Sequence, residues 1–161
     1  MLSITLESPQ QPEVAALFSL SEAYAASLYP PEDRHMVDAD FLAGTHVRFL
    51  VARWQGKAVG CGALVIGDGG MSDGVMGDSR TAEVKRVVVD PAARGRGIGR
   101  ALMRELETIA KAEGIRFIQL ETGPDSTEAL RLYRACGYRE RGPFGKYGPS
   151  PYSLFMEREL A

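Results

Sequence analysis

The residues best suited to chemistry stand in one short run whose types alternate between arginine and glycine. Glycines at every second position free the backbone from Cβ crowding, so successive amide groups can point toward one spot. A helix is expected to begin inside the run, and a helix N-terminus adds partial positive charge there. The run therefore predicts a site for an anion such as a pyrophosphate, formed by Arg94, Gly95, Arg96, Gly97, Ile98, Gly99 and Arg100.

Other readings of the glycine run are open to a spacing test. A Walker loop would end in Gly-Lys-Ser or Gly-Lys-Thr, and this run does not. A dinucleotide fingerprint G-x-G-x-x-G counted from Gly95 would need glycine where Arg100 stands. Both nucleotide loops are therefore excluded. Packing of a helix on a sheet is the remaining alternative, and the three neighbouring arginines argue against it.

Hydrophobic periodicity predicts the elements that must position this run. We expect helices from Pro12 to just before Pro30 and over 38–43, 98–113 and 125–136, the last capped by Asp125 or Ser126. Strands are expected over 2–7, 46–54, 57–66, 81–90, 115–121, 138–141 and 152–159, with a flexible loop over 67–80. Hairpins such as Gln55-Gly56 make the early strands antiparallel. The helix at 98–113 then closes a right-handed parallel βαβ unit in a mixed sheet.

Two motifs in this order resemble the GNAT superfamily of acyl-CoA N-acyltransferases. The run R-x-x-G-x-G, after V-x-V-D-P and before a helix, resembles the acyl-CoA loop of that family. The segment EALRLYRACGY at 128–138 is similar to a second signature, A-x-x-L-Y-x-x-x-G-F/Y. The resemblance covers nearly the whole chain and is weakest over 8–45 and 141–151. It implies one α/β (α+β) domain over 1–161: about seven mostly antiparallel strands, about four helices and a splayed strand pair.

The resemblance also implies a co-substrate, acetyl-CoA, and the residues that hold it. The pantetheine arm would lie along Val87, Val88 and Val89, and the pyrophosphate on the amides from Gly95 to Arg100. At the start of the helix after the fifth strand, Ser126 stands where the family often has Asn. Tyr133 matches the tyrosine whose hydroxyl faces the sulfur of coenzyme A. No metal is implied.

The implied reaction is direct transfer of an acetyl group to a primary amine within a ternary complex. An amine with a pKa near 10.4 is neutral in roughly one molecule in two thousand at pH 7, so its proton must be removed. Glu83 and Glu121 match the positions of glutamate bases in two branches of the family. Alternatives remain open: no dedicated base, carboxylates that are only solvated or paired with Lys85 or Arg86, and a Tyr133 that only packs.

The acceptor site is expected where the resemblance is weakest. Aromatic rings and carboxylates there would suit a small cationic amine or an amino acid, and the residues we single out are Tyr29, Glu32, His35 and Tyr147. Solvated loop residues are the simpler interpretation of each. Two other functions stay open: acetylation of a protein N-terminus or lysine, and a non-catalytic acyl-CoA-binding sensor or regulatory module.

Composition narrows the setting further. The 161 residues are 45% hydrophobic and 25% charged, with a net charge of -2 that gives no general attraction to nucleic acid or membrane. No signal peptide or apolar span is predicted, so a cytoplasmic enzyme is expected. The spacing of Cys61 and Cys136 fits no metal motif, and both are expected as reduced core thiols. No pattern decides whether the chain forms a homodimer.

Overall fold

The computed structural model describes residues 1–31, 36–67, 81–145 and 147–160. The elements follow the predicted order, with a short 3-10 helix, η2, that the sequence patterns missed. They are β1 (Leu2–Leu6), α1 (Pro12–Leu28), α2 (Ala39–Leu42), β2 (Val47–Trp54), β3 (Lys57–Ile66), β4 (Thr81–Val89), η2 (Pro91–Ala93), α3 (Ile98–Ala112), β5 (Phe117–Thr122), α4 (Thr127–Ala135), β6 (Arg139–Arg141) and β7 (Leu154–Glu159). The loop predicted over 67–80 lies, apart from Gly67, outside the described residues.

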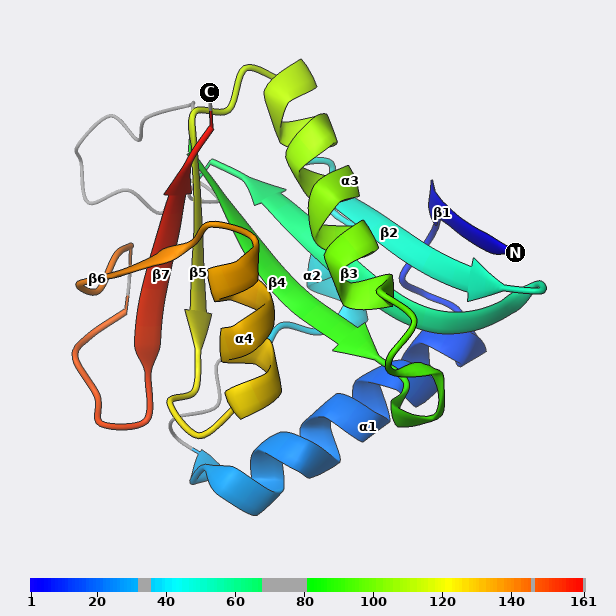
Figure 1. The fold of residues 1–161 in the computed structure, drawn as a ribbon, viewed down its shortest axis with the longest axis horizontal. Coiled ribbons are helices and arrows are strands. Elements are labelled where there is room, and N and C mark those ends of the chain that lie inside the picture. The colour runs from blue at the N-terminus through cyan, green and yellow to red at the C-terminus, as the bar shows by residue number, and fades with distance from the viewer. Residues whose placement is uncertain (32–35, 68–80, 146, 161) are drawn as a thin grey trace.

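The strands of the described residues form one seven-stranded sheet in the order β1-β2-β3-β4-β5-β7-β6. Neighbouring strands are antiparallel except β4 and β5, which are parallel and joined through α3. Figure 1 shows α3 and α4 in front of the sheet and α1 low in the view, and α1 packs on the opposite face of the sheet. The predicted mixed, mostly antiparallel α/β fold with a central βαβ unit is confirmed.

The parallel pair β4 and β5 separates soon after it forms. Pairing runs only from Thr81 with Phe117 to Glu83 with Gln119, although β4 continues to Val89. In Figure 1 the green β4 leans away from the yellow β5, and α4 lies in front of the widening space. The backbone groups on this side of the second half of β4 therefore have no β5 ladder to join, as the splayed pair predicted.

A β-bulge in β4 changes which face its side chains meet. Between its pairs with Lys85 and Val88, β3 advances by two residues while β4 advances by three. Residues four apart in a regular strand share a face. Val84, however, packs in the core under α3, and Val88 packs in the core under α1. The extra residue, Arg86, adopts a left-handed φ of 55°.

The two cores explain why the long helices stay on the sheet. Leu102 and Leu106 of α3 are fully buried, as the predicted apolar face requires, while Ile109 is only partly covered. On the opposite face, Leu17 and Phe18 of α1 are buried against the sheet. Full burial of one such side chain stabilises the fold by roughly 1.5–3 kcal/mol. Both helices are thereby held firmly beside β4.

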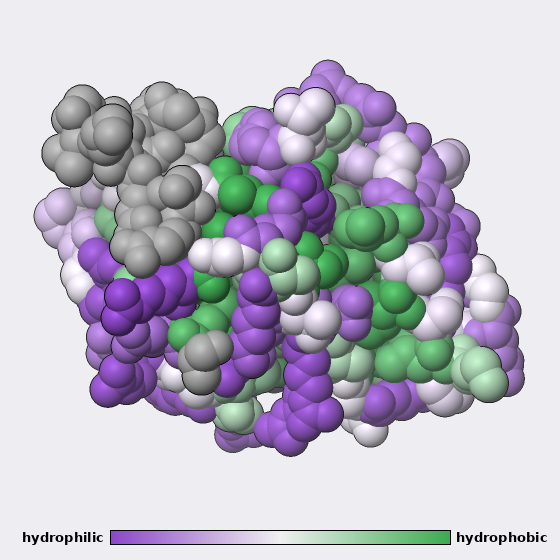
Figure 2. All heavy atoms as spheres, turned by 90° about the horizontal axis from the view of Figure 1, so that it is seen from above, coloured by the Kyte–Doolittle hydropathy of each residue, from purple (hydrophilic) through white to green (hydrophobic). Residues whose placement is uncertain are grey.

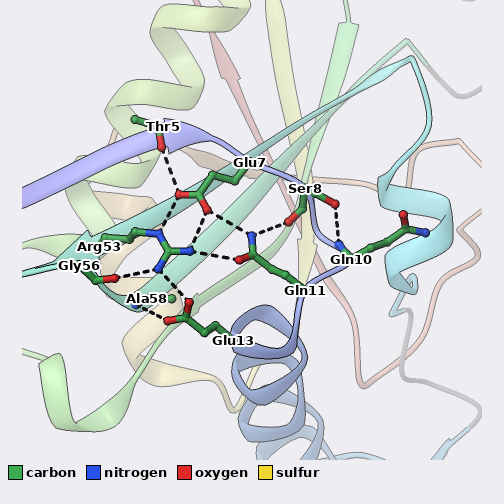
Figure 3. A network of polar contacts seen from close by, with 9 residues as sticks. All are labelled: Thr5, Glu7, Ser8, Gln10, Gln11, Glu13, Arg53, Gly56 and Ala58. Atoms are coloured by element: carbon green, nitrogen blue, oxygen red, sulfur yellow. Dashed lines mark hydrogen bonds and ion pairs between the residues drawn. The ribbon is translucent and has the colours of Figure 1, made fainter.

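A polar network around Arg53 of β2 fixes where α1 begins (Figure 3). The Arg53 Nε and Nη2 atoms donate to the two carboxylate oxygens of Glu7, each at 2.9 Å. Its Nη1 atom donates to Glu13 Oε1 at 3.0 Å and to the Gly56 carbonyl at 2.9 Å. The hydrogen bond from Arg53 is the main cause that lowers the pKa of Glu7. One cation thus ties the end of β1, the first turn of α1 and the β2–β3 turn together.

Some large hydrophobic side chains are exposed on the surface of the protein. In the described residues they include Leu20 and Tyr24 of α1, with Met36 and Tyr152 from two loops. Figure 2 shows the face near the C-terminal end of α3, where hydrophobic residues in the middle are surrounded by hydrophilic ones. Among the described helices, none combines the length and the apolar character needed to cross a bilayer.

Candidate active site

A cavity of about 660 Å³ opens where β4 and β5 separate. Its walls come from the second half of α1, from β4, from the glycine run and from the β5–α4 segment. Most of the residues proposed from the sequence to bind the cofactor or to catalyse line it together, and they are Glu83, Val87, Val88, Val89, Arg94, Gly95, Gly97, Ile98, Gly99, Arg100, Glu121, Ser126 and Tyr133.

The glycines of the run do different work. Gly95 and Gly97 adopt left-handed φ angles of 83° and 73°, which L side chains rarely adopt, and Gly97 is the N-cap of α3. Gly99 instead allows close packing, since a Cβ there would lie 3.1 Å from Cδ2 of Leu132 in α4. The first described helical bond runs from Ala101 N–H to the Gly97 carbonyl at 3.0 Å. The N–H groups from Ile98 to Arg100 thus have no carbonyl within the helix and are available to an anion.

The three arginines of the run do not act alike. Arg94 and Arg100 line the cavity, and Arg94 Nη1 pairs with Glu128 Oε2 at 3.0 Å while both side chains remain largely exposed. The Arg96 guanidinium stacks on the Trp54 ring, 4.9 Å from its centroid, and Arg96 is absent from the described lining. Its side chain therefore points away from the site, and only its backbone amide keeps the predicted role.

Tyr133 in the second half of α4 and Glu121 near the end of β5 lie close enough to interact electrostatically. Tyr133 lines the cavity and is 8% exposed. Burial and then the nearby charge of Glu121 raise the pKa of Tyr133 well above its ordinary value. The phenol consequently keeps its proton throughout the neutral range and can donate a hydrogen bond. Glu121 lines the same cavity within electrostatic reach of this hydroxyl.

The predicted base Glu83 is held by two partners from different parts of the chain. The Tyr147 hydroxyl donates to Glu83 Oε2 at 2.6 Å, and Lys85 Nζ lies 3.1 Å from the same oxygen. Lys85 also donates to the Tyr147 oxygen at 2.7 Å. Burial and the charge of Glu83 raise the pKa of Tyr147, which therefore stays a neutral donor. Packing against Phe144 and Phe155 holds the Tyr147 ring in this position.

This arrangement changes how Tyr147 can act. The described residues that line the cavity include Glu83 and Lys85 but not Tyr147. Tyr147 thus meets the cavity through Glu83, which it orients, and direct contact with an acceptor stays a prediction. The sequence analysis named Lys85 only as a possible pairing partner of the glutamates, and the structure shows that it pairs with Glu83 and lines the cavity. Glu83 and Lys85 stand two apart in a strand and so share a face.

Tyr29 lines the cavity and links its α1 wall to its β5–α4 wall. From the C-cap of α1, its hydroxyl shares a hydrogen bond of 3.0 Å with Ser126 Oγ and accepts one from the Asp125 N–H at 3.1 Å. Ser126 is the N-cap residue of α4, but its hydroxyl makes no capping hydrogen bond to the backbone of α4. The hydroxyl bonds with Tyr29 instead of capping the helix as predicted. The Tyr29 ring also meets Tyr152 edge-on, with centroids 6.4 Å apart.

Arg86 lines the site, although the sequence analysis predicted it only as a possible pairing partner for a glutamate. Its side chain is only 4% exposed, and the residue lines the cavity. The signal was present in Thr81–Val89, because the polar–apolar alternation from Thr81 to Lys85 breaks at Arg86, where two polar residues stand together. Such a break is typical of a bulge.

The remaining predictions concern two acceptor-site residues, metal binding and the two cysteines. Glu32 and His35 lie outside the described residues. Within the described ranges, no group of three or more His, Cys, Asp or Glu side chains could hold a metal ion. Cys61 is buried and Cys136 is half-buried, and both are free thiols.

The sequence relationships agree with this geometry. A model of the acetyltransferase (GNAT) family matches residues 14–138. The chain belongs to the GNAT acetyltransferase family. A protein from Azospirillum brasilense named IAA acetyltransferase is 45% identical over 159 residues, which are 99% of this chain and 98% of that protein. The chain is accordingly an acyltransferase enzyme, as the resemblance implied.

Solved structures of GNAT proteins share the fold throughout. A Klebsiella pneumoniae protein whose crystal structure is described as that of an acyl-CoA N-acyltransferase superposes with a TM-score of 0.79 at 33% identity, covering 100% of this chain and 99% of its own. The PaiA N-acetyltransferase of Thermoplasma acidophilum, in complex with coenzyme A, gives a TM-score of 0.72 over 99% of each chain. At 17% identity, the latter shows the fold alone.

The family uses acetyl-CoA, and the residues of this cavity fit that molecule. The outward side of β4 from Val87 to Val89 lies beyond the last β4–β5 pair, so it can hydrogen-bond an extended arm. Unpaired amides at the start of α3, with Arg94 and Arg100 beside them, suit a pyrophosphate. Tyr133 of α4 lines the same cavity and supplies a protonated donor.

Proposed function

We propose that this GNAT enzyme transfers an acetyl group from acetyl-CoA to a primary amine of a small molecule, by direct transfer in a ternary complex. The observation that carries the proposal is that one cavity joins the amide-rich start of α3 to Glu83 and Tyr133. A site for acetyl-CoA, a candidate proton acceptor and a candidate hydrogen-bond donor thereby line the same cavity. The name of the Azospirillum brasilense relative supports acetyl transfer and makes IAA one compound to test as an acceptor.

The chain's own residues divide the work. Acetyl-CoA, when bound, supplies the acetyl group as an activated thioester. Glu83 accepts the proton of the incoming amine, directly or through water, while the hydrogen bond from Tyr147 keeps its carboxylate in place. The amide C–N bond forms as the C–S bond breaks, and the second proton that the nitrogen loses in forming the amide ends on the departing sulfur. Tyr133 stabilises that sulfur by donating a hydrogen bond, since its raised pKa opposes full proton loss.

The test is thiol release from acetyl-CoA across a panel of amines, including amino acids, with a thiol reagent as the readout. Tyr133→Phe is expected to lower kcat by about 10²-fold or more, because the hydrogen bond to the sulfur forms as charge develops. Tyr138→Phe is the matched control: its ring centroid lies 6.1 Å from that of Tyr133, yet Tyr138 is absent from the described lining. Equal kcat values for the wild type and Tyr133→Phe would remove Tyr133 from the mechanism. Tight acetyl-CoA binding with no release for any amine would favour a sensor.

A further inference from the structure

Arg86 is a buried cation at the irregular point of β4. The extra residue of the bulge, with its left-handed φ of 55°, turns Arg86 onto the same face of the sheet as Lys85. That face meets α1, and the Arg86 guanidinium carbon lies 3.9 Å from the centroid of the Phe18 ring. A left-handed conformation at a non-glycine residue is strained, so the surroundings must hold it. The fold thus maintains an arginine in an unusual place.

The hydrogen-bonding capacity of this cation is incompletely used. Nη2 donates to Glu22 Oε1 at 3.3 Å, and Glu22 is 58% exposed. Nε and Nη1 are buried and have no partner among the described residues. Burial accordingly lowers the pKa of Arg86, the direction expected for a cation short of partners. A carboxylate accepts two parallel hydrogen bonds from a planar guanidinium, either from Nη1 and Nη2 or from Nε and Nη2, so it would replace Glu22 on Nη2 and also use a donor that has no partner among the described residues.

Arg86 lies where its hydrogen-bond donors could bind part of the acceptor. Arg86 stands next to Val87, where the wall proposed for the pantetheine arm begins, and it lines the same cavity as Glu83. Val88 follows Arg86 by two positions, a separation of at most about 7 Å along the strand. An anionic group held by Arg86 would therefore keep a nearby amine close to both the thioester and Glu83.

The mouth of the cavity adds a second feature. Leu20, Tyr24, Met36 and Tyr152 all line it and are among the exposed large hydrophobics, with exposed fractions of 42%, 48%, 37% and 39%. Apolar side chains around the opening suit a ligand whose outer part is apolar. An amine with a carboxylate and an apolar side group would use both features.

We propose that Arg86 binds the carboxylate of the acceptor, so that the enzyme acetylates amines that also carry a carboxylate, with an apolar side group at the cavity mouth. This proposal rests on the proposed amine acetylation. Glu22 acts in it as a competitor, because its carboxylate occupies one guanidinium donor until the acceptor arrives. The ion pair is long and Glu22 is exposed, so the exchange opposes acceptor binding only weakly.

The test compares L-phenylalanine with phenethylamine, which lacks the carboxylate. The ratio of their kcat/KM values in the wild type is expected to favour the acid, and Arg86→Gln is expected to lower that ratio by about 10- to 100-fold. Differences in amine basicity cancel when one ratio is compared between proteins. Arg48→Gln is the matched control, since Arg48 also pairs with a glutamate, Glu113 at 2.8 Å, but is not part of the described lining. A ratio in Arg86→Gln equal to that of the wild type would overturn the proposal.

A second variant covers the case in which Arg86→Gln does not fold. Glu22→Gln removes the competing charge from an exposed position and is expected to lower the KM for phenylalanine about two- to fivefold, with no change for phenethylamine. An unchanged or raised KM for phenylalanine would contradict the role of Arg86.

Binding of N-acetyl-L-phenylalanine, measured by calorimetry, separates this proposal from the reaction itself. Binding that Glu22→Gln strengthens supports the carboxylate site even if the wild type releases no thiol with any amine, a result that would end only the proposed function. No binding to the wild type would refute the carboxylate site.

Discussion

Gly123, between β5 and α4, offers a sharp test of how the two walls of the cavity are joined. A Cβ at this position would lie 1.8 Å from the Tyr29 hydroxyl oxygen and 2.0 Å from Cζ of the same ring. No rotamer adjustment of a few tenths of an ångström relieves such an overlap. Gly123→Ala therefore expels Tyr29 from its place between Ser126 and Asp125.

The expected loss follows from the contacts that Tyr29 makes. Its hydroxyl takes part in two hydrogen bonds, at 3.0 Å with Ser126 Oγ and 3.1 Å with the Asp125 N–H, which contribute about 0.5–1.5 kcal/mol each. Its edge-on contact with Tyr152 adds roughly 0.5–1.5 kcal/mol. Gly123→Ala should lower the free energy of unfolding by about 2–4 kcal/mol. The KM for acetyl-CoA should rise more than kcat falls, because Ser126 loses its position.

Urea unfolding in a double-mutant cycle is the assay. In the Tyr29→Ala background, Gly123→Ala should cost almost nothing, because the clash has been removed. Gly142→Ala is the control: no atom lies within 4 Å of its added Cβ, so it should be neutral or stabilising by about 0.4–1 kcal/mol. The reasoning fails if Gly123→Ala is as harmless as Gly142→Ala, or if its cost is the same without Tyr29.

Three further outcomes are expected. Tyr138→Phe should raise the free energy of unfolding by about 1 kcal/mol, since the hydroxyl is buried without a partner among the described residues, and urea unfolding showing a clear loss would contradict this. Glu7→Gln should lower the free energy of unfolding by about 1 kcal/mol near neutral pH, because a carboxyl whose pKa is lowered in the folded state stabilises the fold above its ordinary pKa of 4.5. Unfolding measured at decreasing pH should show this difference vanish as acid protonates the folded carboxylate. Gly97→Ala should raise the KM for acetyl-CoA and cost about 1–2 kcal/mol, because Gly97 has a φ of 73°, and an unchanged KM would separate the loop from the cofactor.

Regular features of the fold were predictable because local patterns determine them. The Gln55-Gly56 turn has φ angles of 51° and 83°, the left-handed pair that this dipeptide predicts. The helix that starts at Ile98 follows directly from alternating glycines and an apolar face. The placement of Tyr133 near the sulfur of coenzyme A was implied only by the family resemblance, and the structure shows Tyr133 and the glycine run lining one cavity.

Features that depend on tertiary contact could not be predicted in the same way. Arg94 and Arg96 stand two apart in the same arginine–glycine pattern. Arg96 nevertheless stacks on Trp54, which belongs to a hairpin more than forty residues earlier in the chain. Tyr29 meets Ser126 across 97 residues of chain, and local patterning contains no record of that distance. Such contacts arise only after the sheet has brought α1 and α4 together.

The bulge at Arg86 connects the part that could be predicted to the part that could not. A regular β4 would alternate strictly, and Val84 and Val88 would then share one core. One extra residue separates their cores and turns two adjacent cations onto the face that meets α1. It lies within the stretch of β4 after Glu83 that has no pairing with β5. The same irregularity lies in the cavity wall proposed for the cofactor, and under the proposed function it places Lys85 and Arg86 beside the acceptor. If acceptor choice resides in this bulge, amine specificity among proteins of this fold should follow the residues at the bulge more closely than those of the glycine run, which meets only the donor.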